Sequence, residues 1–269
     1  VSPEELDRWW PDAELLFLYF VKDVRAYPSP IQFDTPPGVQ TFIEHVELPH
    51  PELLEKAVKG RIRVLGVKAN VEREGDFASI LLETGGQKIR FDKGSNPRIE
   101  SDCVVLTHAH PDHIGALSKK EIVFAAPPTA KVLKEAGYNV VEMPFRKPTK
   151  LNSVKITPFP VLHSTRAPAA ALRVEGESWA FAYAPDILGW LSREDREACL
   201  GGVDFAFFDA SHPQGFARRD KEGNLWGHAG WSTILSWASK EGVPKVYFIH
   251  FGDAYYNDPE NLEAYMRDL

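Results

Sequence analysis

The 269-residue chain is 43% hydrophobic and 26% charged, which is typical of a globular protein and excludes an intrinsically disordered one. Its formal net charge of −7 argues against a surface devoted to nucleic acid, although it allows a local basic groove. The longest apolar run, Leu15 to Val21, falls far short of the roughly 20 residues that a membrane span needs. Two cysteines and the lack of a secretion-signal pattern predict a soluble, cytoplasmic protein without disulfides.

The first sixty residues differ in texture from the rest of the chain. The capping pattern of Ser2–Glu5 predicts a short helix, and Pro49–Val58 predicts another. Between them lies the proline-rich stretch Tyr27–Gly38, which cannot hold regular structure for long. We therefore divide the chain into an accessory segment, residues 1–60, and a main domain, residues 61–269.

From residue 61 onward, short alternating or β-branched runs predict strands. They cover Arg61–Val67, Phe77–Glu83, Lys88–Asp92, Asp102–Thr107, Ile122–Ala126, Val154–Leu162, Ala169–Val174, Trp179–Ala184, Val203–Phe208 and Lys245–Ile249. Gly85-Gly86 predicts a two-residue hairpin turn. Helices are predicted over Pro128–Ala136, Ser192–Leu200, Trp231–Glu241 and Pro259–Leu269. Strands with interleaved helices indicate an α+β or layered α/β protein with mixed sheets.

A cluster of imidazoles follows one of these strands, in the run Thr107-His108-Ala109-His110-Pro111-Asp112-His113. Histidine is the commonest metal ligand in proteins, and neutral imidazole with carboxylate suits zinc, manganese or iron. A loop that leaves a strand can direct His108 and His110 at one ion, while Asp112 and His113 reach a second one around the turn. The pattern predicts a metal centre rather than a surface histidine cluster, because a core strand precedes it and a helix opens with it.

The run resembles the hallmark of the metallo-β-lactamase superfamily, His-x-His-x-Asp-His after a strand. The turn Asp92-Lys93-Gly94 precedes this hallmark. A lone His163 after a strand, Asp186 after a tyrosine-containing strand, and His250 near the end follow it in the expected order. It covers about residues 61 to 260. It implies the family's α+β fold, a four-layer αββα sandwich with metals bound at one edge, and thus a catalytic main domain.

Carried over residue by residue, the resemblance implies two divalent metal ions, zinc or manganese, with iron as a third candidate. The ligand set that it implies has two groups and a bridge: His108, His110 and His163 for one ion, Asp112, His113 and His250 for the other, and Asp186 between them. Asp112 is also counted among the catalytic residues. Two such ions can clamp a displacement reaction and acidify a shared water.

The segments Phe208–Pro213 and Gly227–Ser232 are similar to the C-terminal half of ribonuclease Z and of cyclic phosphodiesterases, and less so to a protein of pyrroloquinoline quinone biosynthesis. This likeness implies that His228 assists catalysis from the start of a helix. Asp209 is expected either to orient His228 or to hold the imidazole of a metal ligand. A helix N-terminus also favours anions such as phosphate. The sequence departs from ribonuclease Z at Ala229-Gly230, where that family has a His-Ser-Thr pattern.

Three arginines are candidates for binding phosphate, because a guanidinium group pairs with two phosphate oxygens at once. They are Arg218 and Arg219, shortly before His228, and Arg166, just past His163. Four aromatic residues flank the same turns and could stack a ring, although core packing is the simpler expectation. They are Trp190, Trp226, Trp231 and Tyr255.

A few other residues are expected to have structural roles. His212 is predicted to support the site, Cys103 and Cys199 to be buried core thiols, and His45 and His50 to be structural.

These features predict a dinuclear metal-dependent hydrolase in which a metal-bridging hydroxide attacks a small or cyclic phosphodiester. One alternative is a thioester, lactone or β-lactam hydrolase with the same metals, for which the arginines would be dispensable. A second is a nuclease acting on RNA or single-stranded DNA, which the net charge does not favour. A third is a metal-holding but inactive sensor or accessory protein. No membrane partner is expected, and the sequence leaves the oligomeric state open.

Overall fold

The computed structural model describes residues 60–69 and 76–252, and two mixed sheets make up most of this part of the chain. The first sheet has the order β1-β2-β3-β4-β5-β6, antiparallel from β1 to β3 and parallel from β3 to β6. Its strands are Gly60–Gly66 (β1), Ser79–Thr84 (β2), Gln87–Phe91 (β3), Cys103–Leu106 (β4), Ile122–Ala125 (β5) and Asn139–Glu142 (β6).

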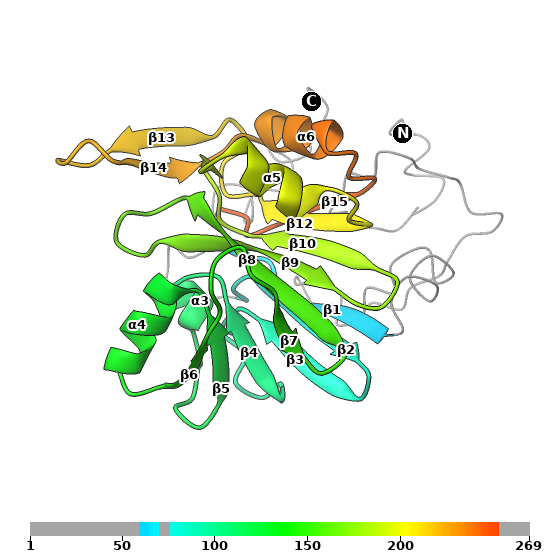
Figure 1. Cartoon of the computed structure of the whole chain (residues 1–269). Coiled ribbons are helices and arrows are strands. Elements are labelled where there is room, and N and C mark those ends of the chain that lie inside the picture. The colour runs from blue at the N-terminus through cyan, green and yellow to red at the C-terminus, as the bar shows by residue number, and fades with distance from the viewer. Residues whose placement is uncertain (1–59, 70–75, 253–269) are drawn as a thin grey trace, which may run out of the picture.

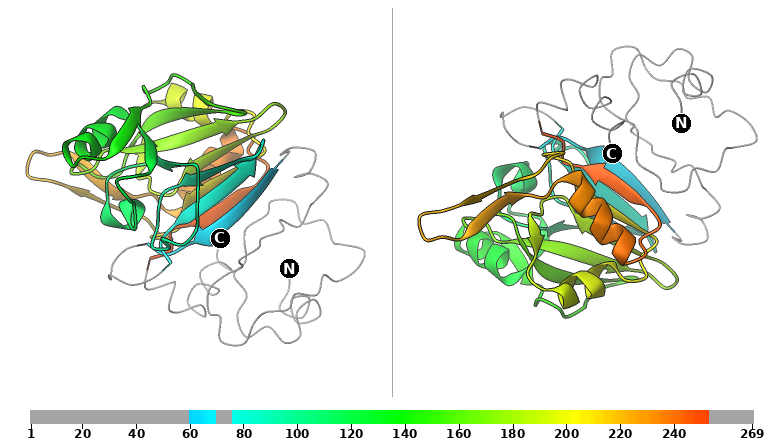
Figure 2. Two further views of the ribbon diagram at one scale, coloured as in Figure 1. Left: turned by 90° about the horizontal axis from the view of Figure 1, so that it is seen from below. Right: turned by 90° about the horizontal axis from the view of Figure 1, so that it is seen from above.

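The second sheet has the order β11-β8-β9-β10-β12-β15, with β7 paired to β8. Its strands are Thr149–Leu151 (β7), Val154–Leu162 (β8), Ala169–Glu175 (β9), Ala180–Ala184 (β10), Gly189–Trp190 (β11), Phe205–Asp209 (β12) and Val246–Ile249 (β15). A separate hairpin pairs Phe216–Arg219 (β13) with Leu225–His228 (β14). It projects beyond both sheets (Figures 1 and 2).

Helices cover the outer faces of the two sheets (Figure 1). They are Pro111–Ile114 (α3), Pro127–Glu135 (α4), Arg193–Leu200 (α5) and Trp231–Lys240 (α6). Helix α4 packs on β5 and β6 of the first sheet, whereas α5 and α6 pack on the second. The result is the predicted four-layer αββα sandwich. None of these helices has the length and apolar character that a bilayer crossing requires.

Side-chain alternation along β4 shows how the layers form. Val104 and Leu106 pack toward α4, while Cys103 and Val105 pack between the two sheets. Phe91 on β3 meets Phe181 across the sheet interface, with ring centroids 5.8 Å apart. A strand that is buried on both faces must be apolar throughout, which is why β4 was recognisable from its sequence.

The predicted strands and helices in the described part of the chain are confirmed, with ends shifted by a few residues. The turn Gly85-Gly86 is a two-residue hairpin, and both glycines have positive φ, as such a turn requires. Strands β6, β7, β11, β13 and β14 were not predicted, because they are short and lack an alternating pattern. The helices expected before residue 60 and after residue 258, with His45, His50 and Tyr255, lie outside the described residues.

Candidate metal centre

The predicted site residues meet at one edge of the sandwich, where strands of both sheets reach their carboxyl ends. His108 and His110 follow β4, and His163 follows β8. Asp186 follows β10, Asp209 ends β12, and His250 follows β15. Because each strand delivers its last residue to the same edge, side chains that are distant in sequence lie close together.

The first predicted group, His108, His110 and His163, is assembled around three nitrogens. His110 Nδ1 lies 2.9 Å from His108 Nε2 and 3.3 Å from His163 Nε2. A tetrahedral zinc site with bonds of about 2.0–2.1 Å has ligand atoms about 3.3 Å apart. The three imidazoles therefore have the spacing of ligands to one ion.

The other ring nitrogen of each of these imidazoles has its own partner. Thr107 Oγ1, which donates to Asp92, lies 3.1 Å from His108 Nδ1, so the hydroxyl accepts from the imidazole. His163 Nδ1 donates to the carbonyl of Gly227 at 3.2 Å. His110 Nε2 lies 3.2 Å from Ser164 Oγ. Such contacts fix the ring orientation and leave the opposite nitrogen free for a metal.

The second predicted group, Asp112, His113 and His250, has the same construction. The Nε2 atoms of His113 and His250 are 3.3 Å apart, and Asp112 Oδ2 lies 3.1 Å from His250 Nε2. His113 Nδ1 donates to Asp92 Oδ2 at 2.8 Å. Ser211 Oγ donates to the carbonyl of His250 and accepts from its Nδ1 at 2.8 Å.

Asp186 lies between the two groups. Its Oδ2 atom is 2.7 Å from His113 Nε2 and 3.5 Å from His108 Nε2, one nitrogen from each group. Its Oδ1 atom is buried and makes no hydrogen bond with the described residues; the Nδ1 atoms of His250 and His228 lie 3.1 and 3.3 Å from it in ion-pair contacts. An acceptor that is buried without a partner is costly unless a cation satisfies it. This is the position that the sequence predicted for a bridging carboxylate.

The charges of the site differ between the two groups of histidines. Burial, reinforced by neighbouring imidazoles, lowers the pKa of His108 well below its usual value and that of His110 to about 4. Burial also opposes protonation of His250, but the Asp186 and Asp112 carboxylates raise its pKa to about 10. Burial would raise the pKa of Asp186, yet His163 and His250 lower it to about 2.

The buried carboxylates thus need positive charge at this edge. In the protein alone, protons on histidines supply it, and divalent cations would supply the same charge while displacing those protons. The described residues form four overlapping groups, and within each group the candidate ligand atoms lie within 4.8 Å of one another. Two of these groups are the predicted ligand groups. On spacing, charge and the buried Asp186 oxygen, the residues fit a divalent metal site.

His228 and Asp209 form a hydrogen-bonded pair beside this centre. His228 Nδ1 donates to Asp209 Oδ2 at 2.6 Å and lies 3.3 Å from Asp186 Oδ1. Asp209 also accepts from the backbone amides of Ile187 and Ser211. Asp209 and His228 also belong to a possible ligand group, but the carboxylate is already occupied by these three donors. The arrangement therefore positions the imidazole, which is one of the two roles considered for Asp209 from the sequence.

The expected location of His228 at a helix N-terminus is wrong. The residue ends β14, and α6 begins later, with Gly230 as its N-cap. The chain stays extended through this point because the Ala229 amide donates to the carbonyl of Ile187. An anion near His228 therefore meets the imidazole rather than the end of a helix.

The three predicted arginines are exposed, two of them on β13 and the third in the turn after His163. Arg218 is exposed on β13, with its guanidinium carbon 5.9 Å from the ring centroids of both Phe216 and Trp226. Arg219 lies on the opposite face of the same strand and donates to the carbonyl of Gly223. Arg166 is exposed in the turn after His163, where its amide donates to Ser164.

The tryptophans divide between the core and the surface. Trp231 is buried and stacks on Phe248, while Trp190 is half-buried against Trp237. Trp226 is half-buried on the hairpin. His212 is exposed and lies 5.5 Å from His228, ring centroid to ring centroid. Cys103 and Cys199 are buried free thiols, as predicted.

Three supporting residues could not be identified from the sequence: Thr107, Ser164 and Ser211. Each hydroxyl lies next to a ring nitrogen of a predicted ligand. Thr107 and Ser164 adjoin ligands in sequence, which is a weak signal. Ser211 is 39 positions from His250, and only the parallel pairing of β12 with β15 brings the two together.

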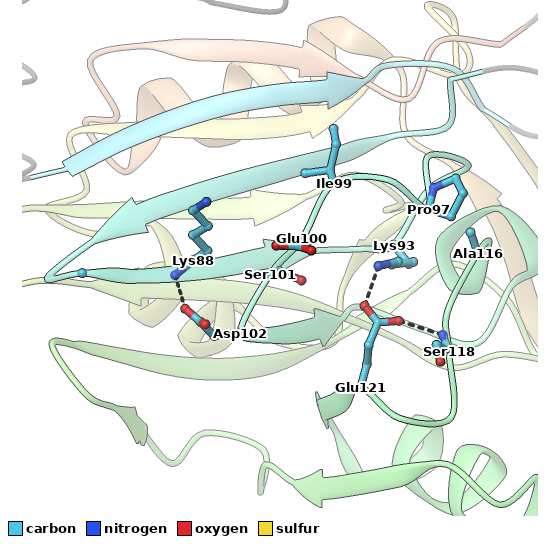
Figure 3. Close-up of a pocket in the computed structure, with 11 residues that line it drawn as sticks. Lys88, Lys93, Pro97, Ile99, Glu100, Ser101, Asp102, Ala116, Ser118 and Glu121 are labelled. Atoms are coloured by element: carbon cyan, nitrogen blue, oxygen red, sulfur yellow. Dashed lines mark hydrogen bonds and ion pairs between the residues drawn. The ribbon is translucent and has the colours of Figure 1, made fainter.

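A hollow of about 520 Å³ lies between the loop after β3 and the loop after α3 (Figure 3). None of the predicted site residues lines it. Lys93 forms an ion pair with Glu121 there, and Glu121 also accepts from the Ser118 amide. The Lys93 amide donates to the carbonyl of His113, so this ion pair fastens the turn beneath a predicted ligand.

A family model described as a Beta-lactamase superfamily domain matches residues 86–251. The matched residues contain the whole predicted centre, and the chain belongs to the metallo-β-lactamase superfamily. Members of this superfamily are mostly hydrolases that depend on divalent metal ions. No curated protein matches the chain by sequence.

Solved structures share the fold at low identity. The metallo-β-lactamase fold protein YhfI from Bacillus subtilis is 16% identical, with a TM-score of 0.55 over 71% of this chain and 85% of its own. A diphosphatase from the PhnP family is 19% identical, with a TM-score of 0.52 over 71% and 85%. The short form of human tRNase Z is 15% identical, with a TM-score of 0.54 over 72% and 93%.

Proposed function

We propose that this protein is a two-metal phosphodiesterase that hydrolyses a small or cyclic phosphodiester. The observation that carries the proposal is the His228–Asp209 pair, 2.6 Å long and directly beside Asp186. Hydrolysis of a phosphodiester expels an alkoxide, which needs a proton as it leaves. An imidazole that is held by a carboxylate next to the metal ligands is suited to deliver that proton.

Different residues would hold the metal ions and protonate the leaving group. His108, His110 and His163 would hold one divalent ion, zinc or manganese, and Asp112, His113 and His250 the other, with Asp186 shared. Such ions polarise a phosphoryl oxygen and acidify water. Asp209 fixes the His228 ring through Nδ1, so Nε2 is the nitrogen that protonates the leaving oxygen.

The comparisons support the proposal only in outline. Two of the three similar structures are named as a diphosphatase and a tRNase, and both names describe enzymes that cleave a bond between phosphorus and oxygen. At 15–19% identity, their likeness to this chain is one of fold. The substrate class therefore depends on the site, and the net charge favours a small substrate over a nucleic acid.

The first test is turnover of bis-p-nitrophenyl phosphate by zinc- or manganese-loaded protein, with chelator-treated protein alongside. We expect activity that disappears without metal and falls about 100-fold or more in Asp186→Asn. Asp195→Asn is the matched control, because Asp195 is a buried carboxylate that pairs with Arg146, away from the centre. Turnover of thioesters, lactones or β-lactams in the absence of diesterase activity would overturn the proposal.

The role of His228 needs substrates that differ in their leaving group. p-Nitrophenolate leaves without a proton, whereas a nucleoside or alkyl alkoxide requires one. His228→Ala should therefore lower kcat about 100-fold for a diester with an alkyl leaving group and much less for bis-p-nitrophenyl phosphate. An equal loss for both substrates would show that His228 only supports the structure.

A further inference from the structure

One face of the β13–β14 hairpin presents ring side chains that lead away from His228. In the pairing register, Phe216 lies opposite His228, and Arg218 lies opposite Trp226. Residues two apart on a strand share a face, so all four side chains lie on the same side of the hairpin. We call these four residues, His228, Phe216, Arg218 and Trp226, the ring face.

The members of the ring face are in contact from one to the next. The Phe216 ring centroid lies 5.3 Å from that of His228 and 5.6 Å from that of Trp226. The Arg218 guanidinium lies 5.9 Å from both aromatic rings. The ring face is thus continuous with the metal centre, because His228 contacts both Asp209 and Asp186.

Packing within the protein does not account for these aromatic residues. Phe216 and Trp226 are half-buried, and neither belongs to the hydrophobic core formed by the described residues. Arg218 is exposed. A two-stranded hairpin that projects from the domain gains little stability of its own, so half-exposed rings and a cation beside a reaction centre point to a ligand.

We propose that the ring face binds the base of a nucleotide whose phosphoester lies at the metal centre. This inference rests on the proposed function and names its substrate class, a phosphodiester that bears a nucleobase. Phe216 and Trp226 offer surfaces on which a planar base can stack. Arg218 can stack on the base or pair with phosphate oxygens, and His228 faces the scissile bond at the other end.

The opposite face of the hairpin provides matched controls. Arg219 and Leu225 lie next in sequence to Arg218 and Trp226 and pair with each other in the register. Leu225 is an exposed apolar side chain, and Arg219 donates to the carbonyl of Gly223. Substitutions at these two positions remove the same kinds of side chain from the same hairpin without touching the ring face.

The test compares binding of adenosine 5′-monophosphate and ribose 5-phosphate to the full-length, zinc-loaded protein by isothermal titration calorimetry. The two ligands share the phosphate and differ by the base. We expect the nucleotide to bind about 10-fold more tightly, with the advantage lost in Trp226→Ala and reduced in Arg218→Ala. Leu225→Ala and Arg219→Ala should keep the advantage, and Trp226→Phe should restore most of it, which excludes simple unfolding of the hairpin.

Two outcomes would overturn the inference. One is a wild-type protein without preference for the nucleotide, and the other is an equal loss of preference in Trp226→Ala and Leu225→Ala. A protein that prefers the nucleotide but hydrolyses no diester would instead contradict the proposed function and leave the ring face as a nucleotide site. The binding test of the ring face and the turnover test of the proposed function can therefore fail independently of each other.

Discussion

The metal centre and the β13–β14 hairpin lie side by side but are built in opposite ways. Most of the predicted ligands are buried, and Thr107, Asp92, Ser164, Ser211 and Gly227 hold the second ring nitrogen of the histidines. Asp92 and His250 even adopt positive φ angles of 51° and 68°, which side chains other than glycine rarely take up. The hairpin, in contrast, is largely exposed, and its rings pack against one another.

The difference matches two proposed roles: the buried centre carries out the reaction, and the exposed hairpin binds the substrate. A reacting centre needs its groups fixed to within a fraction of an ångström, and the second partner of each imidazole achieves that. A recognition surface can be simpler, since stacking tolerates small displacements. The two regions join at Gly227 and His228: the Gly227 amide donates to the carbonyl of His163, and His228 bonds to Asp209.

Among the substitutions that separate the two regions, Asp92→Asn should have the largest effect, a loss of metal affinity. The Asp92 carboxylate accepts hydrogen bonds from Thr107 and from His113 Nδ1. Asparagine replaces one of the accepting oxygens by an NH2 group, which would then face a donor of Thr107 or His113. We expect metal affinity to fall about 100-fold, measured by competition with a chromophoric chelator. The ring face does not contact Asp92, so nucleotide preference in the remaining metal-loaded protein should persist.

Asp195→Asn controls for this prediction as well. Asp195 also receives donors, two of them from Arg146, and the same exchange there should cost stability without changing metal affinity. If both variants lowered metal affinity alike, the effect would come from general destabilisation and not from the orientation of His113.

The centre could be predicted from the sequence largely because its chemistry is local. His108, His110, Asp112 and His113 lie within six residues, directly after an apolar strand that is buried on both faces. The distant ligands His163, Asp186 and His250 were placed by their order along a recognised family pattern. Residue chemistry alone would have left His163 as a capped strand end, Asp186 as a helix cap and His250 undecided between a ligand and a structural residue.

The hairpin could not be predicted, because its strands leave no local signature. β13 reads Phe-Ala-Arg-Arg and β14 reads Leu-Trp-Gly-His, with no alternation of apolar and polar residues and a glycine inside the second strand. With no strand signal at β14, His228 was expected at the start of the helix predicted from Trp231. For the same reason, only the strand register shows that Arg218 and Arg219 lie on opposite faces of the hairpin.

Gly227→Ala would sharpen the comparison, since this residue belongs to both regions. Gly227 has a φ of 140°, and a Cβ there would lie 2.1 Å from the carbonyl oxygen of Phe216. The hairpin base must open, which displaces the carbonyl that holds His163. We expect about 10-fold weaker metal binding together with loss of nucleotide preference, both measured by titration calorimetry.

Gly223→Ala at the hairpin tip is the control for that change. Gly223 also has a positive φ, 87°, but a Cβ there would meet open space. It should cost roughly 1 kcal/mol of backbone strain and leave both metal binding and nucleotide preference unchanged. A tip substitution that weakened metal binding as much as Gly227→Ala would show that the whole hairpin, rather than its base, supports the centre.

The last expected effect leaves metal binding and the hairpin unchanged and concerns only the pH dependence of stability, through Cys103 at the start of β4. Burial, together with the neighbouring Asp102 carboxylate, raises the pKa of Cys103 to about 12, whereas an unfolded cysteine titrates near about 8.5. Above that pH the unfolded chain binds fewer protons than the folded one, so the free energy of unfolding falls as pH rises, by up to about 1.4 kcal/mol per pH unit for this thiol. Urea titrations of the metal-loaded protein between pH 7.5 and 10 should show a shallower decline for Cys103→Ala than for the wild type. Equal slopes would mean that the folded protein also ionises this thiol, so that solvent reaches the start of β4.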